Sequence, residues 1–345
     1  MRQHDDRVHR GRTAPVVRGH RGDSVTHAVP SIDLQAWFHG DDRDRAEVAA
    51  RVDEALQTAG FLLITGHEVS TSLRDDTRAV AREFFALPED VKQTYATAVG
   101  GRGWLPPGAE ANGYAEGTPT PPDMKESFTA ACDTPTGNPA VDAEWFAPNV
   151  WPDAQLPRMR SVVGEYLDEM HALSDELMAL CAVALGLDVD YFEPFLSEPT
   201  YGFNINWYPP LTRVGPAAEG QFRIGPHTDF GTVTVLDREP GLGGLQIYTA
   251  DGQWIDAPYD PAAFTVNIGD LMARWTGDRW RSTRHRVLPP PADAPTEDLV
   301  SLVFFYEANH DAVVESMAPP IGRRSYPATN WGQYLKEKLA AISVG

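Results

Sequence analysis

The sequence predicts an α+β protein that is mainly β, in which a helical amino-terminal half is followed by a β-sandwich or β-barrel. After Gly186, short β-rich runs follow one another and are separated by Gly, Pro and Asp. Before it, the apolar residues of segment 158–186 recur at spacings of three and four, which is typical of a helix. A coiled-coil seam has the same spacing, but a single segment of this kind favours a buried helix along a sheet.

The other elements are predicted from local signals. Gly60 follows an apolar helical repeat at the position of a C-terminal cap, and Ser70 is placed as the N-cap of a helix that Pro88 ends. The amino-terminal half is expected to hold a strand at 29–34, a helix at 48–59, a strand at 61–65, a helix between Ser70 and Pro88, and a Gly- and Pro-rich loop at 100–122. The carboxyl-terminal half is expected to hold strands at 203–208, 222–226, 232–236, 245–248, 254–257, 264–268, 271–275, 283–288 and 300–307, and a last helix at 330–342.

The composition excludes several classes of protein. Apolar residues make up 42% of the 345, which suits a sizeable core and is too much for a disordered chain. The net charge of −20 argues against nucleic acid or an anionic membrane as a partner. The longest apolar run, Met178 to Leu187, is too short to span a bilayer, and residues 1–30 hold no apolar stretch of a secretory signal. Cys132 and Cys181 lack CxxC spacing, so we expect reduced thiols in a cytoplasmic protein.

Two residues with metal-binding character, His227 and Asp229, stand two positions apart in a short extended segment. On a strand, residues i and i+2 face the same way, so this imidazole and this carboxylate can be aimed at one point. His285, in a later β-rich run, offers a second imidazole. Two histidines and one carboxylate leave coordination positions open, as in non-heme Fe(II) oxygenases. His-x-Asp alone is a common chance pair, so the surrounding residues decide how much weight it carries.

Those surroundings carry several motifs in a fixed order. In the carboxyl-terminal half they are Asn206-Trp207-Tyr208-Pro209-Pro210, His227-Thr228-Asp229, Gly244-Leu245-Gln246, Asn267-Ile268-Gly269-Asp270, the segment Ser282 to Val287, and Ser301-Leu302-Val303-Phe304-Phe305. In the amino-terminal half they are Val29-Pro30-Ser31-Ile32-Asp33, Gly60-Phe61, Gly66-His67, Phe84-Phe85-Ala86-Leu87-Pro88 and Lys125-Glu126-Ser127-Phe128. Together they resemble the isopenicillin N synthase-like branch of the Fe(II)- and 2-oxoglutarate-dependent dioxygenases.

This resemblance implies a double-stranded β-helix, or jelly-roll, core at 200–310 and a family N-terminal region at 28–150, within a single oxygenase domain at 28–345. It also implies Fe(II) at His227, Asp229 and His285, activation of dioxygen, and 2-oxoglutarate as cosubstrate. The implied activity is hydrogen-atom abstraction from a small molecule, with hydroxylation, desaturation or ring closure as the outcome, in secondary metabolism or antibiotic biosynthesis. The polar, aperiodic segment 1–27 is expected to be a disordered tail.

The chain departs from the family at one position. The family carries Arg-x-Ser on a late strand, where the arginine pairs with the distal carboxylate of 2-oxoglutarate; here Leu299 stands two residues before Ser301. Three explanations are open. An arginine from a neighbouring strand can replace it, for which Arg274 is the first choice and Arg284 and Arg223 are the others. Neutral donors can hold the carboxylate, for which the family-matched residues are Ser301, Asn206 and Tyr208. Or the enzyme does not use 2-oxoglutarate.

Two other functions therefore stay open. One is an iron oxidase of the same fold that does not use the keto acid, like isopenicillin N synthase. The other is a catalytically silent jelly-roll binding protein, which the missing arginine favours and the retained His-Asp-His set opposes. In each case we expect a small-molecule ligand, no nucleic acid and no membrane, and the sequence does not predict an oligomeric state. His171 is interpreted as an ordinary helix residue and His310 as a loop residue. Trp275, Trp280, Phe304 and Phe305 are expected to pack the core, and Phe128, Phe203 and Tyr306 are placed at the pocket mouth.

Overall fold

Two β-sheets form the centre of the molecule. The computed structural model describes residues 29–117 and 120–343, so the tail expected at 1–27 lies outside the described residues. The larger sheet has the order β1 (Ser31–Asp33), β2 (Phe61–Thr65), β10 (Phe264–Ile268), β7 (Val233–Arg238), β12 (Leu299–Asn309), β5 (Pro199–Tyr208), β4 (Glu126–Ala131), β3 (Gly103–Leu105). The smaller sheet has the order β6 (Ile224–His227), β11 (His285–Val287), β8 (Leu245–Tyr248), β9 (Trp254–Asp256). A two-stranded ribbon joins β13 (Val313–Val314) and β14 (Thr329–Asn330).

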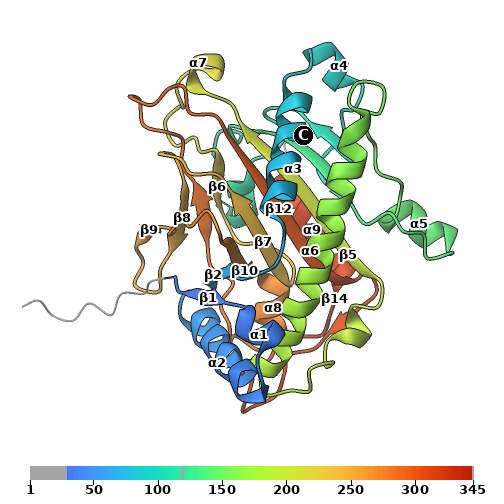
Figure 1. Ribbon diagram of the computed structural model, residues 1–345, viewed down its shortest axis with the longest axis vertical. Coiled ribbons are helices and arrows are strands. Elements are labelled where there is room, and N and C mark those ends of the chain that lie inside the picture. The colour runs from blue at the N-terminus through green and yellow to red at the C-terminus, as the bar shows by residue number, and fades with distance from the viewer. Residues whose placement is uncertain (1–28, 118–119, 344–345) are drawn as a thin grey trace, which may run out of the picture.

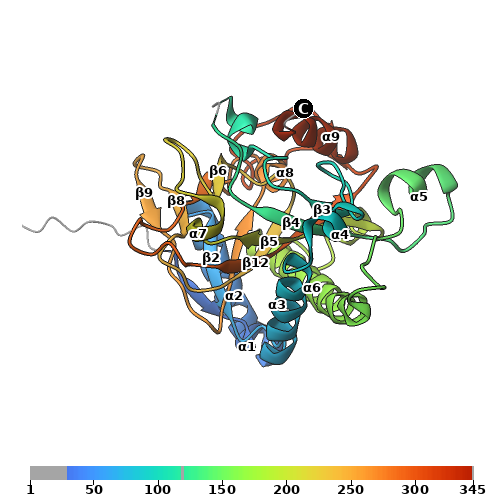
Figure 2. The ribbon, with the colours of Figure 1, turned by 90° about the horizontal axis from the view of Figure 1, so that it is seen from above.

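Helices cover one face of the larger sheet. They are α1 (Gln35–His39), α2 (Asp42–Thr58), α3 (Thr71–Phe85) and the long α6 (Pro157–Ala184), and Figure 1 shows α6 running along the strands. Figure 2 shows α3 and α6 on one side of β4, β5 and β12, and α9 (Trp331–Ile342) on the other. Shorter helices lie in the connections, namely α4 (Glu89–Gln93), η1 (Asn112–Glu116), α5 (Pro139–Trp145), η2 (Glu193–Phe195), α7 (Leu211–Val214) and α8 (Asp270–Trp275).

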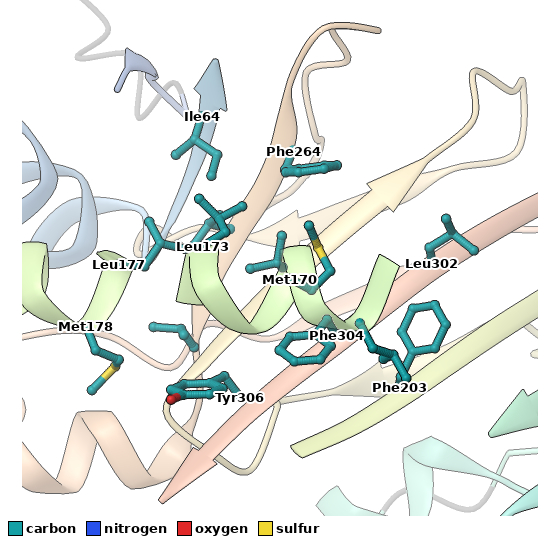
Figure 3. Close-up of a cluster of buried hydrophobic side chains, with 14 of the residues drawn as sticks. Ile64, Met170, Leu173, Leu177, Met178, Phe203, Phe264, Leu302, Phe304 and Tyr306 are labelled. Carbon is teal, nitrogen blue, oxygen red and sulfur yellow. The ribbon is translucent and has the colours of Figure 1, made fainter. Parts of the chain in front are cut away.

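The main hydrophobic core lies between α6 and the larger sheet. Met170 and Leu173 of α6 belong to the same buried cluster as Phe203 of β5 and Phe304 of β12, as Figure 3 shows. Phe203 and Phe304 are direct partners across the β5–β12 ladder, and such aromatic cross-strand pairs stabilise a sheet. The helix predicted at 158–186 is therefore confirmed, together with its place along a sheet, because its three-and-four spacing puts one apolar face on the strands.

Most of the predicted elements are present, within a few residues at their ends, and two predictions were wrong. Residues 271–275 form helix α8 and not a strand: Leu271, Met272 and Trp275 are buried on a helical face, and a short apolar run does not distinguish the two. The loop expected at 100–122 contains strand β3 and the 3-10 turn η1. Ser70 is the N-cap of α3 as predicted, although its side chain makes no capping hydrogen bond to the helix.

Gly60 ends α2 as predicted. Its φ is +69°, and its amide donates to the Ala55 carbonyl at 3.0 Å, which is the left-handed cap geometry that glycine adopts without strain. A Cβ at this position would lie 2.3 Å from the Arg281 carbonyl oxygen. Gly60 thereby sets the sharp turn from α2 into β2, the strand next to the edge strand β1. In the part of the chain that is described, no helix is long and apolar enough to cross a membrane.

Candidate metal centre

The two predicted histidines face each other across neighbouring strands of the smaller sheet. His227 ends β6 and His285 begins β11, and the two residues are direct partners in the antiparallel ladder. Because partners across a ladder point to the same face, their rings lie side by side, with centroids 4.2 Å apart. Asp229 follows β6 by two residues, so its carboxylate joins the imidazoles on that face. Sequence spacing predicted that His227 and Asp229 share a face, and the β6–β11 register brings His285, which was predicted from its own β-rich run, to that face.

The ligand atoms of the three residues converge. Asp229 Oδ1 lies 3.7 Å from His227 Nε2 and 3.6 Å from His285 Nε2, and one ligand atom from each residue lies within 4.8 Å of the others. A metal bonded at roughly 2.1 Å to two ligand atoms can join atoms up to about 4.2 Å apart, so the two distances from Asp229 Oδ1 to the imidazole nitrogens fit one ion. The donor set suits Fe(II) with open coordination positions.

Hydrogen bonds behind the ligand atoms fix their orientation. His227 Nδ1 lies 2.8 Å from the Gly225 carbonyl oxygen and His285 Nδ1 lies 3.1 Å from that of Thr283. Nδ1–H donates to a carbonyl in each case, which leaves Nε2 with a lone pair toward the centre. In each case the backbone carbonyl of the residue two positions earlier fixes the tautomer of the histidine.

The Asp229 carboxylate is held from the larger sheet. Asn267 on β10 donates to its Oδ2 at 2.6 Å, and Thr234 on β7 also hydrogen-bonds to it. Burial alone would raise the pKa of Asp229, but His285, His227 and these two hydrogen bonds outweigh burial and lower it. Asp229 is therefore held as a carboxylate, the form that binds a metal.

Two pockets meet at this centre. A cavity of about 330 Å³ and a smaller one of about 80 Å³ both include His227 and Asp229 in their walls. The smaller pocket runs between the two sheets and is also lined by His285, Leu299 and Ser301. The larger cavity opens on the other side, toward α9. A metal ion held here would be accessible from both.

Three of the predicted cosubstrate residues line the smaller pocket together. Asn206 and Tyr208 lie on β5 and Ser301 on β12, where Ser301 and Asn206 are direct partners. Tyr208 hydrogen-bonds with Ser301 and Asn206, and burial raises its pKa to about 12. Ser127 donates to Asn206 Oδ1 at 2.7 Å. The pocket therefore offers neutral hydrogen-bonding groups opposite the metal ligands.

Comparison with known proteins identifies the family. The family described as the 2OG-Fe(II) oxygenase superfamily matches residues 200–308, and the one described as non-haem dioxygenase in morphine synthesis N-terminal matches residues 29–154. The chain belongs to the 2OG-Fe(II) oxygenase superfamily. It is a dioxygenase that uses Fe(II) and 2-oxoglutarate, and its two sheets are the jelly-roll core that the resemblance implied.

Three relatives illustrate the similarity. The chain is 40% identical over 316 residues to validamycin A dioxygenase of Streptomyces hygroscopicus subsp. limoneus, covering 91% of this chain and 86% of that protein. It is 32% identical over 291 residues to the 2-oxoglutarate-dependent dioxygenase citB of Monascus ruber, covering 82% and 85%. A full-length Neurospora crassa protein crystallised with alpha-KG and thymine matches with a TM-score of 0.78 and 30% identity, covering 91% of this chain and 96% of that chain.

The arginines proposed from sequence do not line the smaller pocket of this oxygenase. Arg274, the first choice, lies on α8 and donates to the Pro327 carbonyl and to Thr329 Oγ1 at the wall of a different pocket. Arg223 is buried and paired with Glu297 at 2.6 Å, and Arg284 lies over the rings of two aromatic residues on β8 and β9. The prediction for Arg274 was wrong because it assumed a strand at 271–275.

The larger cavity has polar residues that the sequence did not single out. Glu307 on β12 lines it, and its Oε2 is buried with no hydrogen-bond partner among the described residues. Burial and the nearby Asp229 raise the pKa of Glu307 well above its usual range. Gly231 makes room for it, since a Cβ there would lie 1.6 Å from Glu307 Oε2. Lys125 lines the same wall and pairs with Glu110.

The aromatic residues that line the pockets and those that lie in the core differ from the ones expected from the sequence. Phe305, expected in the core, lines both pockets, whereas Phe203 and Tyr306, placed at the pocket mouth, are fully buried in the core beneath α6. Phe128 is buried there as well. Successive strand residues point to opposite faces, so the parity of β12 could have separated Phe305 from Phe304 and Tyr306 once Ser301 was assigned to the pocket.

Proposed function

We propose that His227, Asp229 and His285 hold one Fe(II), that 2-oxoglutarate occupies the smaller pocket, and that the substrate enters the larger cavity. The observation that carries this assignment is the convergence of the three ligand side chains where the two pockets meet. Bound Fe(II) and 2-oxoglutarate supply the activation of dioxygen and the abstraction of a hydrogen atom from the substrate. The two pockets keep cosubstrate and substrate on separate sides of the metal.

The protein's own residues orient the reactants. The Gly225 and Thr283 carbonyls hold the two imidazoles, and Asn267 holds the Asp229 carboxylate. On the cosubstrate side, Asn206, Tyr208 and Ser301 offer hydrogen bonds. The half-buried Phe305 lines both pockets and contributes an apolar wall to each.

For the substrate, we propose a small polar molecule of secondary metabolism, in antibiotic biosynthesis, and validamycin A is the first candidate. The proposal rests on the relative named validamycin A dioxygenase. A cavity lined by both charged and apolar side chains, among them Lys125, Glu307 and Leu339, suits a polar molecule of moderate size. Cys132 and Cys181 are buried and free, which supports a reducing compartment such as the cytoplasm.

The relatives named as 2-oxoglutarate-dependent dioxygenases favour the keto-acid enzyme over the oxidase and the silent binding protein. The test is turnover of validamycin A with Fe(II), 2-oxoglutarate and dioxygen, with succinate and the substrate's mass measured together. We expect succinate and oxidised product in equal amounts. Formation of oxidised product without 2-oxoglutarate would favour the iron oxidase that does not use the keto acid. Succinate formation without oxidation of validamycin A would rule out this substrate.

A further inference from the structure

The missing arginine leaves one end of the smaller pocket without its family cation. Leu299 occupies that position and lines the pocket with an apolar side chain. A 2-oxoglutarate molecule whose keto acid end bound the metal would, as the family's Arg-x-Ser motif implies, direct its distal carboxylate toward Leu299 and Ser301 in this pocket. Burying a carboxylate without a cationic partner is costly, so a cation that reaches this end from another strand is to be expected.

Arg238 lies at that end. It is the last residue of β7 and the direct partner of Ser301 across the β7–β12 ladder, so both side chains point to the same face. Thr234, which contacts Asp229, shares this face, because it lies four residues earlier on the same strand. This face of β7 therefore presents Thr234 next to the metal centre and Arg238 at the far end of the pocket.

Arg238 also lies within reach of the place that an arginine at Leu299 would serve. Since Ser301 and Arg238 are partners, Leu299 and Arg238 are diagonal neighbours on adjacent strands. Diagonal neighbours are about 7–8 Å apart, a distance that long side chains bridge. The guanidinium of Arg238 on β7 can thus reach the space that the guanidinium of an arginine at position 299 on β12 would occupy.

The bonding of Arg238 distinguishes it from the other arginines nearby. Among the described residues that line the smaller pocket it is the one lysine or arginine. Its Nη2 group donates to the Ala257 carbonyl at 3.0 Å and to that of Pro258, while its buried Nε–H has no partner among the described residues. Arg74 and Arg223, by contrast, are paired with the carboxylates of Asp237 and Glu297. Two neutral carbonyls and the Tyr259 ring hold the guanidinium of Arg238, and no carboxylate among the described residues forms an ion pair with it.

We propose that Arg238 binds the distal carboxylate of 2-oxoglutarate and replaces the arginine that the family carries at the position of Leu299. The inference rests on the proposed place of the keto acid in the smaller pocket. The guanidinium donates to the carboxylate from β7, Ser301 adds a hydroxyl from β12, and the backbone carbonyls of Ala257 and Pro258 hold the guanidinium. Such charge-assisted hydrogen bonds are stronger than neutral ones.

The experiment compares two keto acids in anaerobic Fe(II) protein, by titration of the visible charge-transfer band of the iron–keto-acid chelate. 2-Oxoglutarate has the distal carboxylate, and 2-oxopentanoate has a methyl group in its place. We expect Arg238→Met to weaken 2-oxoglutarate binding by about thirtyfold or more, as for the loss of one half of a buried charge pair. Binding of 2-oxopentanoate and the iron content should not change. In Arg238→Met/Leu299→Arg, the family arrangement should recover part of the lost affinity.

The control is Arg274→Met, which removes an arginine outside this pocket and should leave both titrations unchanged. If Arg238→Met does not fold, Arg238→Lys replaces it and should weaken 2-oxoglutarate alone. Equal 2-oxoglutarate binding by wild type and Arg238→Met, or equal loss of both keto acids, would overturn the role of Arg238. Absence of any 2-oxoglutarate band in the wild-type protein would instead overturn the proposed keto-acid site itself.

Discussion

Adjacent residues on β7 serve opposite faces of the larger sheet. Asp237 points into the core, where it is fully buried and accepts hydrogen bonds from Arg74 at 2.9 and 2.7 Å and from Arg78. Arg238 points into the smaller pocket. A slip of β7 by one residue would exchange these two charges. The Asp237 ion pairs, which tie α3 to β7, therefore also fix the register on which the pocket depends.

The first prediction concerns this buried cluster. Asp237→Asn should lower the free energy of unfolding by about 3–5 kcal/mol, because it leaves two buried guanidinium groups without their carboxylate. Urea unfolding measures the change. Glu47→Gln, which removes the exposed partner of Arg43 on α2, should have little effect because exposed pairs contribute little. Equal stability of the two variants would show that the cluster does not hold α3 to the sheet.

The second prediction concerns the metal ligands. His285→Ala should lower Fe(II) affinity by at least about tenfold, since removing even the partners of metal ligands has effects of that size. Anaerobic reconstitution followed by iron analysis gives the stoichiometry, and circular dichroism checks the fold. The control is His171→Ala, a half-buried histidine on α6 that lies against Tyr201. Full iron occupancy in the His285→Ala protein would remove His285 from the ligand set.

At the scale of elements, the glycines that follow two helices differ in how closely they are packed. Gly60 and Gly186 both follow a helix, α2 and α6, and both have a positive φ, +69° and +72°. They differ in their surroundings: a Cβ at Gly60 would lie 2.3 Å from the Arg281 carbonyl oxygen, whereas a Cβ at Gly186 meets nothing within 4 Å. An alanine substitution at Gly186 therefore adds backbone strain alone, whereas one at Gly60 adds backbone strain and a steric clash.

The third prediction uses this pair. Gly186→Ala should cost about 1–2 kcal/mol, the strain of a left-handed conformation with a side chain. Gly60→Ala should cost that and about 1–3 kcal/mol more, because an added methyl group must displace well-packed backbone. Thermal and urea unfolding of both variants give the difference. Equal costs would mean that the segment around Arg281 shifts freely away from Gly60.

The same distinction between local and distant causes explains what the sequence could predict. The spacing of His227 and Asp229, the face of α6 and the cap at Gly60 are local properties, and the structure has them where they were expected. The place of Arg238 depends on its register with Ser301, a residue far away in the chain. The sequence of β7 alone does not indicate this register. Arg274, in a segment that was wrongly expected to be a strand, was therefore preferred.

At the scale of the whole molecule, the proposed site joins the two sheets. His227 and His285 belong to the smaller sheet, while Asn206, Ser301 and Arg238 belong to the larger one. A keto acid that chelates the metal and reaches the residues on β5, β7 and β12 has to contact both sheets. Its binding free energy is then available only to the folded arrangement in which the sheets face each other.

The last prediction follows from this geometry. 2-Oxoglutarate should raise the melting temperature of the Fe(II) protein by several degrees, because a ligand at about a hundred times its dissociation constant stabilises the folded state by about 2.7 kcal/mol. It should do so far less after the metal is removed with a chelator, since the carboxylate end alone contacts only the larger sheet. Scanning calorimetry of the protein with metal, with 2-oxoglutarate, with both and with neither measures the coupling. The His285→Ala protein serves as the control and should lose the joint effect. If 2-oxoglutarate stabilised the metal-free protein as much as the Fe(II) protein, the keto acid would bind without contacting the metal, and the site would not join the sheets as argued.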